Sequence, residues 1–207
     1  MQLMSARAQL LRTLGRIDES IDLAKRAAAV DPLRARIVIF LGNLLYYAGR
    51  YEEADAALRK ALELNPQASA VHTIRGKLFI SQGHLQEALA EMELEPSDWD
   101  KYTGLAMVYH ALGRTNDSQS ELEQLIATHK SDCAYQIAEV YAYRGDPDNA
   151  FEWLDRAYDQ RDPGLRDLKI DPLFKLLRKD QRFNQLLKRM RLENKGQPGS
   201  PATALSS

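Results

Sequence analysis

The chain has 207 residues, of which 44% are hydrophobic and 28% charged, and its formal net charge is −1. This balance excludes a fibrous or disordered chain, and a charge near zero gives no overall field that would attract nucleic acid or an anionic membrane. Cys133 is the one cysteine, which rules out an internal disulfide and argues against a metal site. No signal peptide and no run of 18 apolar residues is visible. We therefore expect a cytoplasmic protein without a membrane span, a metal or a cofactor.

A repeat with a glycine at its centre runs through most of the chain. The spacings between successive glycines are 34, 34, 30 and 32 residues, and the glycines are Gly15, Gly49, Gly83, Gly113 and Gly145. Each can end one helix and open a short turn, because glycine takes the left-handed conformation without steric cost. The pattern predicts five helix-turn-helix repeats at about 1–34, 35–68, 69–98, 99–130 and 131–163.

Small side chains recur where the two helices of a repeat must approach each other. In the second helices these positions are Ser20, Ala54, Ala88, Ser118 and Ala150. In the first helices they are Ala8, Gly42, Gly76, Ala106 and Ala138, and a large residue follows three positions later. With these positions, the turn glycine and closing prolines such as Pro66, residues 1 to about 163 resemble the tetratricopeptide-repeat (TPR) family. The resemblance implies an all-α, right-handed superhelix whose first helices line a concave groove.

Repeat three departs from this pattern. It ends early, at Glu95-Pro96, so its second helix should be about one turn shorter than the others. We expect the stacking of repeats three and four to be disturbed there and the groove to widen locally.

Residues 164–192 leave the pattern and are expected to form C-terminal capping helices, since the last repeat of a solenoid otherwise exposes an apolar face. Asp171-Pro172 should open one of these helices, and a second carries an apolar stripe formed by Phe183, Leu186, Leu187 and Met190. The segment resembles the ending of bacterial TPR arrays in signalling and regulatory proteins. Residues 193–207 are rich in Gly, Pro and Ser and are predicted to be disordered.

The resemblance also implies which side chains face the groove. By register, the expected partner-binding residues are Arg36, Asn43, Tyr46, Tyr47, Lys77, Met107, His110, Tyr135, Glu139 and Tyr143. Tyrosines among a few polar groups suit a peptide, because they offer a broad contact area and lose little side-chain entropy. Some of these tyrosines could instead pack between repeats. Tyr47 and Lys77 hold no packing position of the repeat, so replacing both by alanine is expected to leave stability almost unchanged.

Two more specific functions are not supported by the sequence. Chaperone-binding TPR domains grip a terminal carboxylate at five positions, of which only Asn43 fits here. The four histidines lie on different helices or turns, without metal-ligand spacing, and no phosphate-binding loop occurs. We therefore predict no catalytic residues.

The leading hypothesis is a protein-protein interaction module that binds a peptide or protein segment in the concave groove. One alternative is a sensory or regulatory domain of a larger bacterial signalling protein. Another is a self-assembly element that associates through an exposed end of the solenoid. Residues 164–207 hold ten Lys and Arg against four Asp and Glu, which marks either a docking patch or the solvated face of a terminal helix.

Overall fold

A computed structural model describes residues 2–193, and every regular element within that range is helical. The all-α prediction is therefore confirmed. Of the tail predicted to be disordered, residues 194–207 lie outside the described residues. No helix within residues 2–193 has the length and apolar character needed to cross a membrane.

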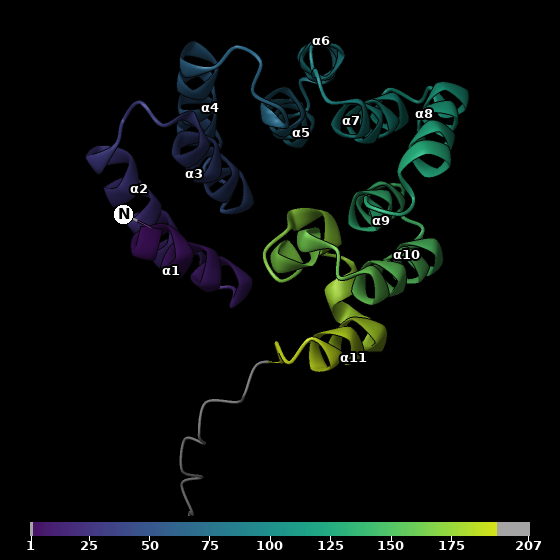
Figure 1. Cartoon of the computed structure of the whole chain (residues 1–207). Coiled ribbons are helices and arrows are strands. Elements are labelled where there is room, and N and C mark those ends of the chain that lie inside the picture. The colour runs from purple at the N-terminus through teal and green to yellow at the C-terminus, as the bar shows by residue number, and fades with distance from the viewer. Residues whose placement is uncertain (1, 194–207) are drawn as a thin grey trace, which may run out of the picture.

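Ten α-helices follow one another in pairs and curve into a superhelix, as Figure 1 shows from α1 to α10. The pairs are α1 (Gln2–Thr13) with α2 (Ile17–Val30), α3 (Ala35–Tyr47) with α4 (Tyr51–Leu64), α5 (Val71–Gln82) with α6 (Leu85–Glu93), α7 (Asp98–Ala111) with α8 (Thr115–His129), and α9 (Ala134–Tyr143) with α10 (Pro147–Gln160). The division of residues 1–163 into five repeats at the expected boundaries stays a prediction.

The turn glycines adopt the backbone conformation that the sequence requires. Gly49 and Gly145 have φ angles of 73° and 75°, and the three others lie at 73° to 79°. A side chain at these positions would be strained, because L-residues rarely adopt positive φ. The predicted turn at the centre of each pair is thus confirmed.

Small residues allow the helices of a pair to pack closely. A Cβ atom on Gly42 would lie 2.8 Å from the Leu58 side chain. The two serine positions add a polar contact across the helix pair. The Ser20 hydroxyl donates a hydrogen bond to the Ala8 carbonyl at 2.7 Å, and Ser118 donates in the same way to Ala106 at 2.5 Å. These bonds satisfy two hydroxyls that are buried at the crossing.

Helix α6 is short, as predicted, with 9 residues against 14 in α4. The predicted widening beside it is wrong. The fully buried Met92 fills the space, since it packs against both Gly76 in α5 and Gly104 in α7. Because α6 ends early, the Glu95 carboxylate lies at the start of α5. There it accepts hydrogen bonds from the backbone N–H groups of Ala70 and Thr73, at 3.0 and 3.2 Å. Repeats three and four are therefore closely joined.

We expect Gly76→Ala to lower the free energy of unfolding by about 1–3 kcal/mol, because the added Cβ overpacks the site. It would lie 2.7 Å from two atoms of the Met92 side chain and 3.3 Å from the Ala88 carbonyl oxygen. Urea denaturation monitored by circular dichroism measures the change. Combining Gly76→Ala with Met92→Val is the control, and a loss equal to the sum of the two single losses would contradict this contact as the cause.

The chain after α10 forms three short 3₁₀ turns, η1 (Pro163–Asp167), η2 (Pro172–Phe174) and η3 (Leu177–Lys179), and then helix α11 (Gln181–Arg189). Asp171-Pro172 therefore opens a 3₁₀ turn and not the predicted α-helix. Asp171 still caps this turn, since its carboxylate accepts the backbone N–H of Leu173 at 2.9 Å.

Helix α11 packs against the last helix pair, and its role as a cap stays a prediction. The apolar stripe of α11, formed by Phe183, Leu186 and Leu187, is buried in the same core as α10. On the outside, Arg182 pairs with Asp148 at 2.8 Å and Arg189 with Asp155 at 2.5 Å. These pairs join α11 to the last repeat.

Candidate functional site

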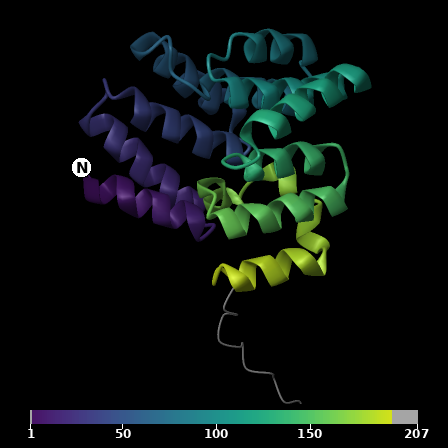
Figure 2. The ribbon, with the colours of Figure 1, turned by 45° about the vertical axis from the view of Figure 1, so that its right-hand side comes forward.

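Residues 162–174, here called the inner segment, lie inside the curve of the superhelix. Figure 1 shows this part of the chain between α9 and α1, and Figure 2 shows it beside the same helices from a second direction. Phe174 and Leu168 are fully buried, and the Phe174 ring stands edge-on to Tyr135 with centroids 5.3 Å apart. Gly164 passes so close that a Cβ there would lie 2.5 Å from the Tyr135 ring. The protein thus fills part of its own concave surface.

Three aspartates attach the inner segment to the superhelix. Tyr135 in α9 donates its backbone N–H to Asp162 at 3.0 Å and its hydroxyl to Asp171 at 2.9 Å. The hydroxyl of Tyr47 in α3 donates to Asp167 at 3.3 Å. The other oxygen of Asp167 forms an ion pair with Nε of Arg12 in α1 at 2.9 Å, in an orientation that does not make a hydrogen bond. The inner segment therefore connects the first helix to the ninth.

Buried charges surround these contacts. Lys77 in α5 pairs with Glu139 in α9 at 2.8 Å, and only 13% and 4% of the two side chains are exposed. Burial raises the pKa of Glu139 well above its usual value, and the nearby Asp171 raises it further against the opposing effect of Lys77. Burial lowers the pKa of Lys77, but Glu139 and Asp171 outweigh this effect and hold it above its usual value.

Asp167 is the third buried carboxyl of this cluster. Burial raises the pKa of Asp167 to about 6, although Arg12 opposes the shift. With Arg12 and Lys77 as cations and Asp167, Asp171 and Glu139 as acids, the cluster is neutral when one carboxyl holds a proton. Burial raises the pKa of both Glu139 and Asp167, so the proton belongs to the cluster as a whole, in which Glu139 also shares a hydrogen bond with Asp171.

The structure brings most of the predicted groove residues together but covers many of them. Tyr46, Met107, Tyr135 and Glu139 are at most 3% exposed. Their burial follows from the inner segment and from packing between repeats, so they are not accessible to a partner in this conformation. Their role as binding residues stays a prediction that requires the inner segment to leave.

Tyr47 and Lys77 also differ from expectation. Tyr47 bonds to Asp167 and Lys77 to Glu139, so the prediction that replacing both would leave stability unchanged is wrong. His110 and Tyr143 lie at the C-terminal ends of α7 and α9, with ring centroids 5.9 Å apart, and His110 is exposed.

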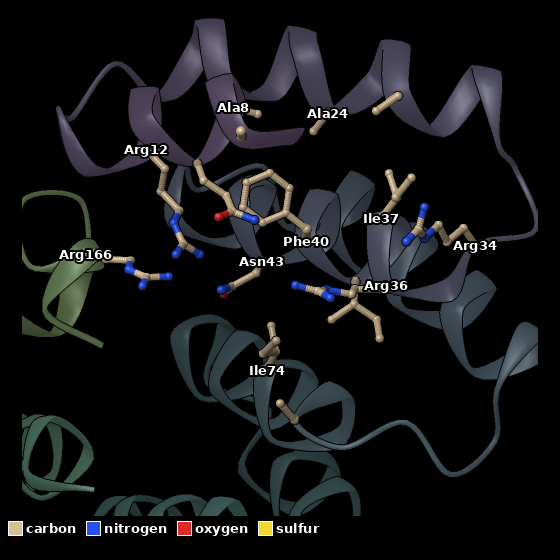
Figure 3. Close-up of a pocket in the computed structure, with 15 residues that line it drawn as sticks. Ala8, Arg12, Ala24, Arg34, Arg36, Ile37, Phe40, Asn43, Ile74 and Arg166 are labelled. Atoms are coloured by element: carbon tan, nitrogen blue, oxygen red, sulfur yellow. The ribbon is translucent and has the colours of Figure 1, made fainter. Parts of the chain in front are cut away.

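A pocket remains open at the N-terminal part of the concave surface. It has a volume of about 610 Å³ and is lined by α1, α2, α3, the start of α5 and Arg166 of the inner segment (Figure 3). Ile37, Ile39, Phe40 and Ile74 provide apolar surface, and Asn43 points into the space. Of the predicted partner-binding residues, Arg36 and Asn43 lie here.

Four arginines line this pocket: Arg12, Arg34, Arg36 and Arg166. Among the described residues, no acidic side chain lines it. Arg12 is paired with Asp167 and lies 5.3 Å from the centroid of the Phe40 ring. The other three are exposed, and within residues 2–193 no ion pair is found for them. Arg12, Arg34 and Arg166 were not predicted as site residues, because they come from three separate parts of the chain and only the fold brings them to one pocket.

One group in the described range has metal-ligand chemistry, His129, Asp132 and Cys133, whose ligand atoms lie within 4.8 Å of one another. Burial raises the pKa of the Cys133 thiol to about 12, so it keeps its proton at neutral pH and is a poor ligand.

Comparisons with known proteins agree with this geometry. Among curated proteins, "Small glutamine-rich tetratricopeptide repeat-containing protein 2" of Mycosarcoma maydis is 39% identical over 62 residues, which are 30% of this chain and 18% of that protein. "TPR repeat-containing thioredoxin TTL4" of Arabidopsis thaliana is 26% identical over 117 residues, or 55% of this chain and 16% of that protein. The chain thus spans less than a fifth of these relatives.

Solved structures show the same fold. TTC0263, a thermophilic TPR protein of Thermus thermophilus, superposes with a TM-score of 0.63 at 20% identity, covering 81% of this chain and 96% of that one. PilW, a type IV pilus biogenesis factor, superposes with a TM-score of 0.57 at 12% identity, covering 92% and 91%. The family described as "Tetratricopeptide repeat" matches residues 5–54, 41–100 and 103–165. The paired helices, the turn glycines and this match over most of the chain establish that the protein belongs to the tetratricopeptide repeat family.

Proposed function

We propose that this protein binds a segment of another protein in the open pocket between α1, α3 and α5. The TPR fold is a scaffold for protein-protein interaction in general. The observation that carries the finer proposal is the division of the concave surface. The inner segment covers the part next to α9, whereas a pocket of about 610 Å³ stays open next to α1.

The composition of the pocket suits a peptide. Its volume falls in the range of about 300–1,000 Å³ that is typical of ligand sites, and such sites combine apolar walls with a few polar groups. Phe40, Ile39 and Ile74 supply the apolar wall for a side chain of the partner. The Asn43 amide has a donor and an acceptor, which suit the two polar groups of a peptide backbone.

We infer a binding role rather than a catalytic one. The pocket offers arginines, amides and apolar groups, and no lining residue is a nucleophile or a general base at neutral pH.

A cytoplasmic location and the regulatory alternative stay predictions. Self-association is a second candidate, favoured by two exposed leucines, Leu10 on α1 and Leu14 in the turn that follows it (59% and 41% exposed). Sedimentation at several concentrations tests it.

Peptides selected from a random 12-residue display library should bind in this pocket. For such a peptide, Asn43→Trp is expected to weaken binding at least about 10-fold in fluorescence polarisation, because the indole occupies the space that the peptide needs. Gln124→Trp on the exposed face of α8 is the matched control and should bind normally. Backbone NMR shifts of the wild-type protein give a second readout that does not depend on a substitution. NMR shift changes confined to the outer helices, or equal peptide binding by Asn43→Trp and Gln124→Trp, would reject the pocket as the binding site.

A further inference from the structure

We infer that the segment bound by the open pocket is acidic, with Asp or Glu side chains that pair with Arg34, Arg36 and Arg166. This inference rests on the proposed function and names the chemistry of the partner. It follows from the charges of the pocket, from the way the same groove holds the inner segment, and from the geometry of its arginines.

The three arginines meet at the pocket from different elements. Arg34 immediately precedes α3, Arg36 lies in its first turn, and Arg166 belongs to η1 of the inner segment. Figure 3 shows Arg36 and Arg166 extending toward the space around Asn43 from opposite sides, with Arg34 at the rim. A bound segment between them would be within reach of guanidinium groups on both sides.

The pocket lacks its own counter-charge. Arginines elsewhere in the described chain commonly pair, as Arg16 does with Glu19 and Arg114 with Asp117. Among the described residues, Arg12 is the one pocket arginine for which an ion pair is found. Carboxylates of a partner would supply the missing counter-charge and accept charge-assisted, bidentate hydrogen bonds.

The inner segment shows how the concave surface already binds carboxylates. Its aspartates 162, 167 and 171 are each bound by groove residues, and Asp167 reaches Arg12 at the edge of the pocket. The next residue back along the chain, Arg166, is turned into the pocket. An acidic partner in the open part would place further carboxylates against arginines, as Asp167 already lies against Arg12.

Side-chain carboxylates, and not a terminal carboxylate, are the groups that this arrangement fits. The positions that grip a chain end in chaperone-binding TPR domains correspond in repeats one to three to Ser5, Gln9, Phe40, Ala70 and Ile74, none of which is a cation. In repeats two to four only Asn43 fits, and it is not a cation either. The cations instead lie around the rim, on both sides of the apolar wall. They favour a segment in which acidic residues flank one apolar side chain.

The test selects 12-residue peptides from a random display library against the wild-type protein and against Arg34→Gln/Arg36→Gln/Arg166→Gln. We expect wild-type selections to be enriched in Asp and Glu at two or more positions and the variant selections to lose this enrichment. The best acidic peptide and its Asn/Gln counterpart are then compared by fluorescence polarisation. The counterpart should bind at least about 10-fold more weakly, and the difference should shrink in high salt.

A charge-matched control is Arg26→Gln/Lys175→Gln/Lys179→Gln, which removes three exposed cations outside the pocket and should keep wild-type selectivity. If the selected peptides show no acidic preference but Asn43→Trp still weakens their binding, the inference of an acidic partner is overturned and the proposed function stands. Peptides insensitive to Asn43→Trp would overturn both. Tighter binding of a 12-nucleotide single-stranded DNA in the pocket would assign the arginines to nucleic acid and also overturn the inference.

Discussion

Phe174→Ala is expected to lower the free energy of unfolding by about 3–5 kcal/mol, because it leaves a cavity between the inner segment and α9. The Phe174 side chain is fully buried and stands against Tyr135, which also holds Asp162 and Asp171. Losing the ring therefore weakens the main apolar anchor of the inner segment. Chemical denaturation measures the loss.

Leu176→Ala is the control for this substitution. The Leu176 side chain is 75% exposed, two residues further along the same chain, so its removal should change stability by less than about 0.5 kcal/mol. Hydrogen exchange gives a second readout at the backbone N–H of Tyr135, which bonds to Asp162 and should exchange faster in Phe174→Ala. Equal stability of the two variants would mean that the inner segment contributes little to the fold.

Lys77→Met is expected to cost about 3–5 kcal/mol at pH 8, since it removes one cation from a buried cluster and keeps the carboxyls. Lys77 is the ion-pair partner of Glu139, and Asp171 lies close enough to raise the pKa of both groups. Methionine keeps a similar length and introduces no new polar group. At pH 5 the loss should be smaller, because protonation can then neutralise the excess negative charge.

The wild-type protein should itself be more stable at pH 5 than at pH 8. The pKa of Asp167 rises from its usual 3.8 to about 6 and that of Asp100 to about 7, in both cases through burial. A carboxyl with a raised pKa holds its proton more tightly in the folded state. The stability that this proton uptake adds to the folded state is therefore fully present below pH 3.8. It is lost as the pH rises through about 6 for Asp167 and about 7 for Asp100.

Lys77→Met/Asp171→Asn provides the matched test of the charge argument. The substitution removes one negative charge, and the asparagine oxygen can accept either the Tyr135 hydroxyl or the Leu173 N–H but not both, so the loss of Asp171→Asn alone is measured as well. The double variant should therefore recover part of the stability that Lys77→Met loses at pH 8. Additive losses, or a Lys77→Met loss of the same size at pH 5 and pH 8, would show that packing and not charge explains the effect.

Part of the candidate site could be predicted from the sequence. Arg36 and Asn43 lie in the pocket as their register on α3 implies, and Tyr135 and Glu139 do face the concave side. Register places a side chain on one face of a helix, because the 3.6-residue period is a local property. It does not show what covers that face.

The sequence by itself determined the helix pairs, the turns and the close approach of the helices. Gly49 and Gly145 can adopt positive φ because they lack a side chain, and Ser20 and Gly42 allow close packing because they are small. Only the tertiary structure decided that residues 162–174 fold into the concave side and leave one pocket open. The contacts that hold them join residues 36 and 120 positions apart, from Tyr135 to Asp171 and from Tyr47 to Asp167. Such a segment has no helical period, so its place depends on where burial and charge are satisfied in the assembled superhelix.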